Sequence, residues 1–169
     1  VSYSGLIQAN EAAYGIKGIP SYHFDNANVI VSFGADFLGT WLSPVEFAKQ
    51  YASKRKVTKT NTVMSRHFQF ESMYSMTGAS ADERYTHRPS ELAAALLNLY
   101  AQLGGSVSAP ALSDKKLKSG IEAAAKELKA AGGNALVVSG SNDANVQVIV
   151  NAINDIIGAN GKTVNYGTL

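Results

Sequence analysis

The 169-residue sequence contains no cysteine, so its own residues can form no disulfide, cysteine-ligated zinc site, iron–sulfur cluster or thiolate nucleophile. Fifteen Lys and Arg residues against thirteen Asp and Glu leave a formal net charge of +2, too small for the basic surface that nucleic-acid binding needs. No apolar run approaches the roughly 18 residues of a membrane span. The sequence therefore predicts a soluble segment with no direct membrane insertion and no nucleic-acid partner.

Groups that could carry catalysis are also scarce. The three histidines, His23, His67 and His87, show no metal-ligand spacing, and neither a GxSxG elbow nor a GxxxxGK[ST] phosphate loop is present. We expect each histidine to be structural or to face solvent. The sequence therefore predicts no catalytic residue and no metal site in this chain.

Two short Val-rich runs that end at a glycine are the most informative features present. They are ANVIVSFGAD at 27–36 and GNALVVSG at 133–140, and a helical pattern follows each. An apolar run without polar alternation is typical of a strand covered on both faces. A glycine directly after such a strand lets the backbone turn sharply or lie close to a ligand. We therefore expect function at the carboxyl ends of these strands.

Strand and helix patterns alternate along almost the whole chain. The patterns predict helices over 3–14, from 43, from 90, after 114 and over 143–157, and strands over 28–33, 64–71, 82–87, 135–139 and near 162–166. This alternation favours one α/β domain over residues 1–169, with three layers and a mostly parallel Rossmann-like sheet that carries helices on both faces. Because the chain starts without Met and its last strand-like segment runs almost to Leu169, we expect a segment of a longer protein.

Two local patterns add detail to this expectation. Ser43, Pro44 and Glu46 have the spacing of a capping box with a proline start, which predicts the beginning of a helix. In the second strand, MSRHFQFE places Met64, Phe68 and Phe70 on one side, and the polar residues between them predict an opposite face that is only partly covered.

Binding candidates follow the first two strands. Glu71 and Ser72 come at the end of the second strand, where an acidic side chain in nucleotide-binding folds often accepts hydrogen bonds from ribose hydroxyls. The alternative is that Glu71 caps the next turn. Asp36, with Gly34 close by, either accepts from a ligand amide or binds its own loop in an Asx-turn.

A third candidate is the Arg88-Pro89 pair after the short third strand. The planar guanidinium of Arg88 could form a bidentate bond to phosphate or carboxylate, or it could pair within the chain with Asp82 or Glu83. The single tryptophan, Trp41, could stack on a base or pack over the sheet.

Three longer segments carry a pattern in common with a known family. They are GADFLGTW at 34–41, ESMYSMTGASADERYTHRPSE at 71–91 and LVVSGSNDANVQVIVNAINDIIGANGKTV at 136–164. Together they resemble the molybdopterin oxidoreductase superfamily, and the resemblance extends in order from about residue 22 to 166. Among its branches the chain is most similar to the molybdopterin-like part of the iron–sulfur subunit of alternative complex III, a bacterial respiratory quinol oxidase complex of the cytoplasmic membrane.

The resemblance implies an α/β domain that, in molybdenum enzymes, holds the guanosine end of a pterin dinucleotide. Glu71 would match the acidic position that reads the nucleotide, and Arg88-Pro89 the loop beneath it. The sequence departs from the family pattern at two places. Asp36-Phe37 replaces an Asn-Pro type turn, and Ser90-Glu91 replace Gly-Thr-Asp after the proline. A bulky Phe and a lost Gly leave less room for a pyrophosphate at backbone N–H groups.

The resemblance therefore implies a structural or interaction domain of a respiratory electron-transfer complex, on the periplasmic face, with cofactor binding lost. Its partners would be the rest of its own subunit and neighbouring subunits, and iron–sulfur clusters elsewhere would carry the electrons. In this case we expect Phe37 and Trp41 to fill the crevice at the ends of the first two strands. The alternative is a functioning domain for molybdopterin guanine dinucleotide, with its contacts drawn from Gly34, Asp36, Glu71, Ser72, Arg88 and Pro89. A third option is an unrelated nucleotide-binding module.

Overall fold

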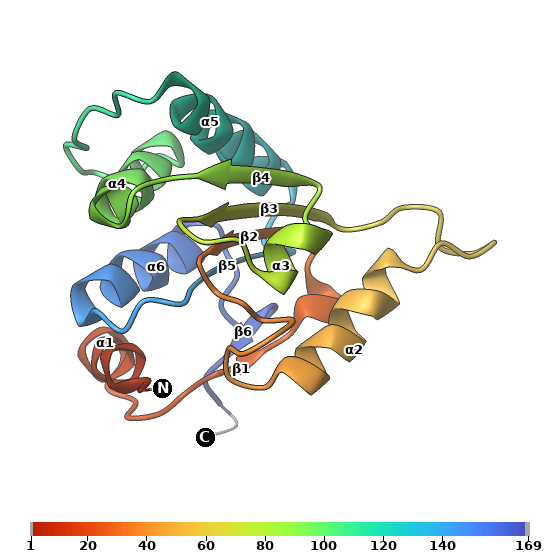
Figure 1. Cartoon of the computed structure of the whole chain (residues 1–169). Helices are drawn as coiled ribbons and strands as arrows, with labels where there is room; N and C mark the ends of the chain where they lie inside the picture. The colour runs from red at the N-terminus through yellow and green to blue at the C-terminus, as the bar shows by residue number, and fades with distance from the viewer. Residues whose placement is uncertain (1, 168–169) are drawn as a thin grey trace.

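A four-stranded parallel sheet forms the middle layer of the computed structural model, which describes residues 2–167 (Figure 1). Its strands are β2 (Val29–Phe33), β3 (Arg66–Glu71), β4 (Glu83–Thr86) and β5 (Ala135–Ser139), in the spatial order β4-β3-β2-β5. The chain therefore moves outward from β2 to β3 and β4 and then returns to the other side of β2. The predicted α/β class with a mostly parallel, Rossmann-like sheet is confirmed.

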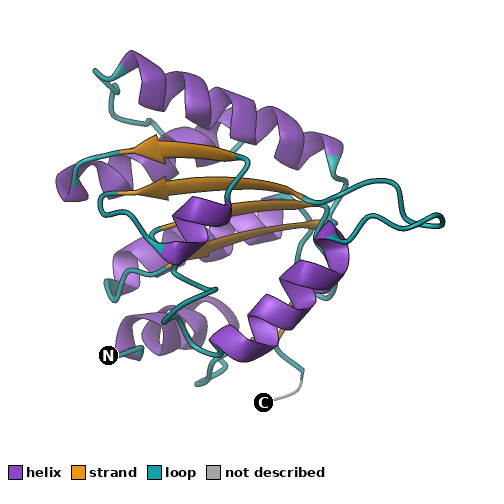
Figure 2. Ribbon diagram, turned by 45° about the vertical axis from the view of Figure 1, so that its right-hand side comes forward, coloured by secondary structure: helices purple, strands orange, loops and turns teal. Residues whose placement is uncertain are grey.

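Helices cover both faces of this sheet (Figure 2). The structure contains α1 (Ser4–Tyr14), α2 (Pro44–Arg55), α3 (Met76–Ser80), α4 (Leu92–Gln102), α5 (Lys115–Ala130) and α6 (Ala144–Ile156), with short 3-10 turns at Phe24–Asn26 and Pro89–Glu91. Helices α4, α5 and α6 pack on one face, whereas α2 and α3 lie on the other, and α1 packs against α6. None of the helices within residues 2–167 has the length and apolar character that crossing a membrane requires.

The two central strands are buried along their full lengths, as their sequences predict. Every residue of β2 and of β5 is buried, and their ends are in register, with Phe33 opposite both Phe70 of β3 and Ser139 of β5. The carboxyl ends of these three strands consequently meet at one edge of the sheet. After β5, Gly140 lies so close to Gly34 that a Cβ atom on Gly140 would approach the Gly34 carbonyl oxygen to 2.3 Å.

Each face of the sheet has its own apolar core. On the α4–α6 face, Phe33 stacks on Phe70 with a centroid separation of 4.8 Å, and buried leucines of α4 pack over them. On the α2 face, aromatic rings dominate the core. There Phe37 stacks on Phe24 with a centroid separation of 4.4 Å, and Trp41 packs beside Tyr22.

Two local expectations were wrong in detail. Helix α2 begins at Pro44, but the Ser43 side chain makes no capping bond and the Glu46 carboxylate accepts from Gln50 instead, so no capping box forms. In the second strand, Met64 precedes β3 and is exposed, and the alternating polar residues His67, Gln69 and Glu71 are buried rather than partly covered. The alternation of apolar and polar residues in β3 therefore reflects two covered faces of the strand, one apolar and one polar.

The last predicted strand does not join the main sheet. Val164–Asn165 form β6, which pairs antiparallel with β1 (Ser21–Tyr22) in a separate two-stranded sheet. Two residues of strand carry too little periodicity to be predicted, and β1 was missed for that reason.

Side chains of the last third of the chain cover the outer edge of β5. The Asn154 side-chain amide bonds both backbone groups of Val137, accepting from its N–H at 3.0 Å and donating to its carbonyl at 2.8 Å. Thr163 donates to the carbonyl of Ala135, and Gln147 donates to that of Ser139. These side chains satisfy backbone groups that an open edge strand would offer to another strand.

Substitution of Asn154 by alanine should remove this edge support. Because it leaves a buried N–H and a buried carbonyl without partners, we expect the free energy of unfolding to fall by about 2 kcal/mol. Urea denaturation measures the effect. Asn145→Ala is the matched control, since Asn145 is exposed on the same helix, and equal losses for both variants would contradict the role assigned to Asn154.

Candidate functional site

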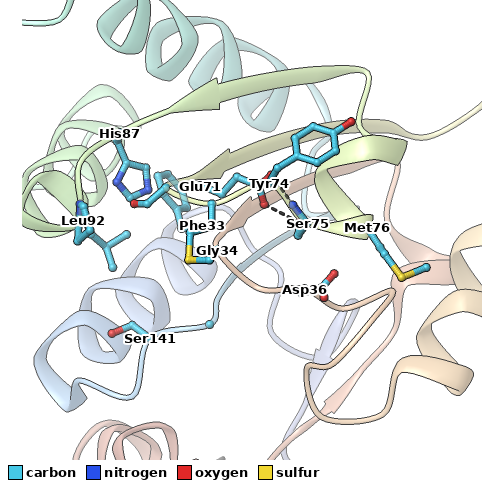
Figure 3. Close-up of a pocket in the computed structure, with 14 residues that line it drawn as sticks. Phe33, Gly34, Asp36, Glu71, Tyr74, Ser75, Met76, His87, Leu92 and Ser141 are labelled. Atoms are coloured by element: carbon cyan, nitrogen blue, oxygen red, sulfur yellow. Dashed lines mark hydrogen bonds between the residues drawn. The ribbon is translucent and has the colours of Figure 1, made fainter.

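A pocket of about 770 Å³ lies at the carboxyl ends of the parallel strands (Figure 3). We call it the strand-end pocket. Its lining comes from the loops that follow the strands: Gly34 and Asp36 after β2, residues 72–76 after β3, His87 and Pro89 after β4, and Gly140 and Ser141 after β5, together with Phe33, Glu71 and Leu92. Of the residues that the sequence singled out, Gly34, Asp36, Glu71, Ser72 and Pro89 are brought together here.

The most constrained residue of the pocket is Glu71, at the end of β3. Its side chain is only 3% exposed, and its carboxylate accepts four hydrogen bonds from the protein. Oε1 accepts from the Arg84 Nε at 2.7 Å and from the Ser75 N–H at 3.2 Å. Oε2 accepts from the Ser75 hydroxyl at 2.6 Å and from the Gln69 amide at 3.2 Å. A carboxylate offers about four acceptor positions, so Glu71 has none left.

These donors keep Glu71 ionised. Burial opposes the charge, but the hydrogen bonds from Ser75, Arg84 and Gln69 outweigh it and lower the pKa of the Glu71 carboxyl. Of the two roles considered for Glu71, the structure supports the local one, because the carboxylate binds the turn that starts α3.

The start of α3 is packed tightly around this ion pair. The Ser75 hydroxyl accepts from the Gly78 N–H at 2.9 Å and so caps the helix. A Cβ atom on Gly78 would come within 2.0 Å of Glu71 Oε1 and within 3.1 Å of Arg84 Nε. Glycine at position 78 is therefore required for the helix to approach the carboxylate.

Asp36 joins two of the loops that form the pocket. Its Oδ1 accepts from the backbone N–H of Thr77 at 3.2 Å and from the Thr77 hydroxyl at 2.7 Å. The Thr77 hydroxyl in turn accepts from the Leu38 N–H at 3.0 Å. The Asp36 carbonyl also closes its own turn by accepting from the N–H groups of residues 39–41. Asp36 therefore ties the β2 loop to α3, a long-range contact that an Asx-turn does not describe.

Arg88 lies outside the strand-end pocket. It borders a neighbouring surface hollow with Glu91 and Asp114. Of the two options considered for Arg88, the pairing with Asp82 or Glu83 does not form, because Asp82 makes a bidentate pair with Arg55 and Glu83 pairs with Arg66. Within residues 2–167, Arg88 makes no ion pair, so its guanidinium is presented at the surface beside the pocket.

Phe37 and Trp41 do not fill the crevice at the strand ends. Both are buried, Phe37 completely and Trp41 with 6% exposed, but they belong to the aromatic core under α2 and neither lines the pocket. The expectation that these rings occupy the edge of the sheet was therefore wrong. The Asp36-Phe37 turn points Phe37 down into the core, where it stacks on Phe24.

A chain of buried polar groups leads from Glu71 along β3, and sequence reasoning missed it. Gln69 donates to Glu71, the Gln69 Oε1 lies 3.0 Å from His67 Nε2, and His67 Nδ1 lies 3.0 Å from the Tyr51 hydroxyl. His67, Gln69 and Glu71 alternate in RHFQFE and share the face that α2 and α3 cover. Polar residues at every second position of a strand are the signal of such a network, but they indicate it only if that face of the strand is known to be covered by helices.

The ionised Glu71 fixes the direction of this chain. Since Glu71 only accepts, Gln69 donates its amide N–H and turns its oxygen toward His67, which must then carry its proton on Nε2. Burial lowers the pKa of His67 to about 4, so the ring is neutral near pH 7. His67 Nδ1 is thus an acceptor for the Tyr51 hydroxyl, which also lies 3.0 Å from the Ser80 carbonyl.

Within residues 2–167, no group of three or more His, Asp or Glu side chains is arranged to hold a metal ion. Comparison of the sequence with protein-family models and with curated proteins gives no match. The strand-end pocket is therefore judged by its own geometry and chemistry.

Replacing Glu71 by glutamine should strongly destabilise the fold. The change removes the partner of the half-buried Arg84 and gives Ser75 and Gln69 a poorer acceptor, so we expect a loss of about 3 kcal/mol in the free energy of unfolding. Chemical denaturation measures it. Glu83→Gln is the matched control, because the Glu83–Arg66 pair is far more exposed than Glu71, at 32% and 44%, and should contribute less than about 1 kcal/mol, while the amide oxygen still accepts from the Tyr85 hydroxyl. Similar losses in the two variants would contradict the special position of Glu71.

His67 should make stability depend on pH. Folding lowers its pKa to about 4, whereas the unfolded chain binds that proton near pH ~6.5, so stability should fall as the pH drops through this window, by about 3 kcal/mol in all. Glu71 and Asp82, whose pKa values are lowered, affect stability only below about pH 4.5. Urea titrations at a series of pH values test this. His67→Gln should flatten the curve above pH ~4.5, and an unchanged slope would refute the assignment.

Proposed function

We propose that this chain is a molybdopterin-oxidoreductase-like domain of a subunit in a respiratory electron-transfer complex. In this proposal the domain has a structural and interaction role and has lost cofactor binding. The resemblance of residues 71–91 and 136–164 to that superfamily supports the family, and the chemistry of the strand-end pocket supports the loss. Its partners would be the rest of its subunit and neighbouring subunits at the periplasmic face of the cytoplasmic membrane.

The observation that carries the loss of cofactor binding is the saturation of Glu71. A carboxylate that reads a guanine base or a ribose must have acceptor positions free for the ligand's N–H or O–H donors. The Glu71 carboxylate already accepts from Ser75, Arg84 and Gln69. A nucleotide at this position would have to displace protein donors that also hold the loop in place.

Helix N-termini, where α/β folds usually bind phosphate, support the same conclusion. At α6, the Asp143 carboxylate caps the helix by accepting from the backbone N–H of Asn145 at 2.8 Å. At α3, the Glu71 carboxylate accepts from the N–H of Ser75, the residue that caps the helix. A pyrophosphate at either end would meet a carboxylate, so the residues present do not fit a guanine dinucleotide.

The size of the pocket favours the alternative of a functioning dinucleotide domain. A volume of about 770 Å³ lies within the usual range of ligand sites, roughly 300 to 1,000 Å³. Gly34 adopts a φ of 69° at the end of β2, a conformation that such sites often use for close backbone approach. The alternative would place the nucleotide against Gly34, Ser72 and Pro89, with Arg88 at the edge.

Calorimetric titration with GDP distinguishes these two possibilities. If cofactor binding is lost, wild-type protein should give no binding at GDP concentrations up to about 1 mM, because the acceptors of Glu71 are occupied and carboxylates stand at the helix ends. Binding in the micromolar range that is abolished both by Glu71→Ala and by the pocket-filling Ser141→Trp would overturn the proposal. Circular dichroism of each variant separates loss of binding from loss of fold.

A further inference from the structure

We propose that the strand-end pocket and its border receive a segment of a partner protein that carries a large apolar side chain next to a Lys or Arg. The inference rests on the proposed interaction role and assigns that role a surface and a partner chemistry.

Three large apolar side chains border the pocket and face solvent. Met73 is 82% exposed, Tyr74 is 72% exposed and Met76 is 68% exposed. Met73 and Tyr74 come from the loop between β3 and α3, and Met76 is the first residue of α3. All three line the pocket, and Figure 3 shows Tyr74 and Met76 along one side of it. Methionine adapts to irregular partner surfaces, and tyrosine is enriched among the residues that dominate binding energy at protein interfaces.

The loop that presents these side chains is held rigidly from below. Arg84 binds Glu71 and also lies over the ring of Tyr74, with the guanidinium carbon 4.6 Å from the ring centroid. On the other side, Thr77 is fixed by Asp36. An apolar border that is ordered in advance loses little conformational entropy when it binds, which is the property of a preformed docking surface.

The pocket wall suits an apolar side chain. Leu92 lies opposite Met76 and contributes apolar surface, Pro89 adds a rigid edge, and Phe33 borders the pocket although it is only 1% exposed. Figure 3 shows Leu92 and His87 across the pocket from Tyr74 and Met76. A leucine, methionine or aromatic side chain of a partner would therefore be enclosed from both sides.

The charge of the pocket lining determines which residue of the partner should lie next to its apolar side chain. Two carboxylates, Asp36 and Glu71, line the pocket, and none of the described Lys or Arg residues does. Arg84 neutralises Glu71, whereas Asp36 makes no ion pair within residues 2–167. Within those residues the only hydrogen bond that Asp36 Oδ2 accepts comes from the Thr40 hydroxyl, at the long distance of 3.4 Å. A cationic side chain is the complement of this carboxylate, and an anionic one would be repelled.

Selection of displayed random 12-residue peptides on the immobilised full chain tests the proposal. The enriched peptides should carry a large apolar residue within about two positions of Lys or Arg, and a synthetic representative should bind in the micromolar range. The double variant Met73→Ser, Met76→Ser and the pocket-filling Ser141→Trp should each weaken that binding at least ~10-fold. Val45→Ser is the matched control, because Val45 is 85% exposed on α2 and lies outside the pocket lining, and it should leave the affinity unchanged.

A second variant tests the charge preference separately. Asp36→Asn keeps the Oδ1 acceptor for Thr77 and removes the charge, so it should abolish the preference for Lys or Arg while apolar peptides still bind. Enrichment of acidic peptides, equal binding to wild type and Ser141→Trp, or no enrichment at all would overturn the inference. Such a failure, with no GDP binding in the calorimetric experiment, would leave the proposed function standing and move its contact surface elsewhere. Micromolar GDP binding that displaces the peptide would overturn both.

Discussion

The buried Glu71–Arg84 ion pair is the interaction on which the functional end of this molecule depends. It joins the last residue of β3 to the neighbouring strand β4, and the same carboxylate fixes the turn into α3 through Ser75. Because Gly78 leaves just enough room for it, the helix can lie directly against the strand end. The ion pair therefore holds the loop in place at the strand-end position where nucleotide-binding α/β folds often carry an acidic residue for the ribose.

The same charge organises the face of β3 that α2 and α3 cover. A carboxylate that only accepts hydrogen bonds orients Gln69, which in turn sets the protonated nitrogen of His67. The buried polar row from Glu71 to His67 thus has one hydrogen-bond arrangement, and a defined network of this kind favours a single packing of the helices above it. The charge of Glu71 at the pocket is consequently coupled to the hydrogen bonds that Gln69 and His67 make on the buried face of β3.

Much of the fold could be predicted from the sequence, because its strongest signals are local. The Val-rich runs that form β2 and β5 indicate strands buried on both faces. The apolar spacing that forms α5 indicates a helix buried on one face. The two-residue strand β1 gave no such signal, and the separate pairing of β6 with it was not predicted, since that pairing depends on where distant parts of the chain meet. The capping box at Ser43 matched a pattern without forming its bonds.

The candidate site was predicted in its location and not in its chemistry. Gly34, Asp36, Glu71, Ser72 and Pro89 were expected at strand ends and do meet at one pocket. That Glu71 is saturated could not be foreseen, because the Arg84 donor reaches it only through the register of β3 with β4. The burial of Phe37 likewise depends on Phe24, a residue before β2 that no spacing rule connects to the turn after it.

Because the outer edge of β5 is covered, a further strand can join the sheet only at its other edge. With Asn154, Gln147 and Thr163 already bonded to its backbone, β5 has little to offer an incoming strand. Any chain that extends this sheet in an assembly must therefore add beside β4. The domain then acts as a terminal unit on one flank, which prevents copies of it from joining side by side into an endless ribbon.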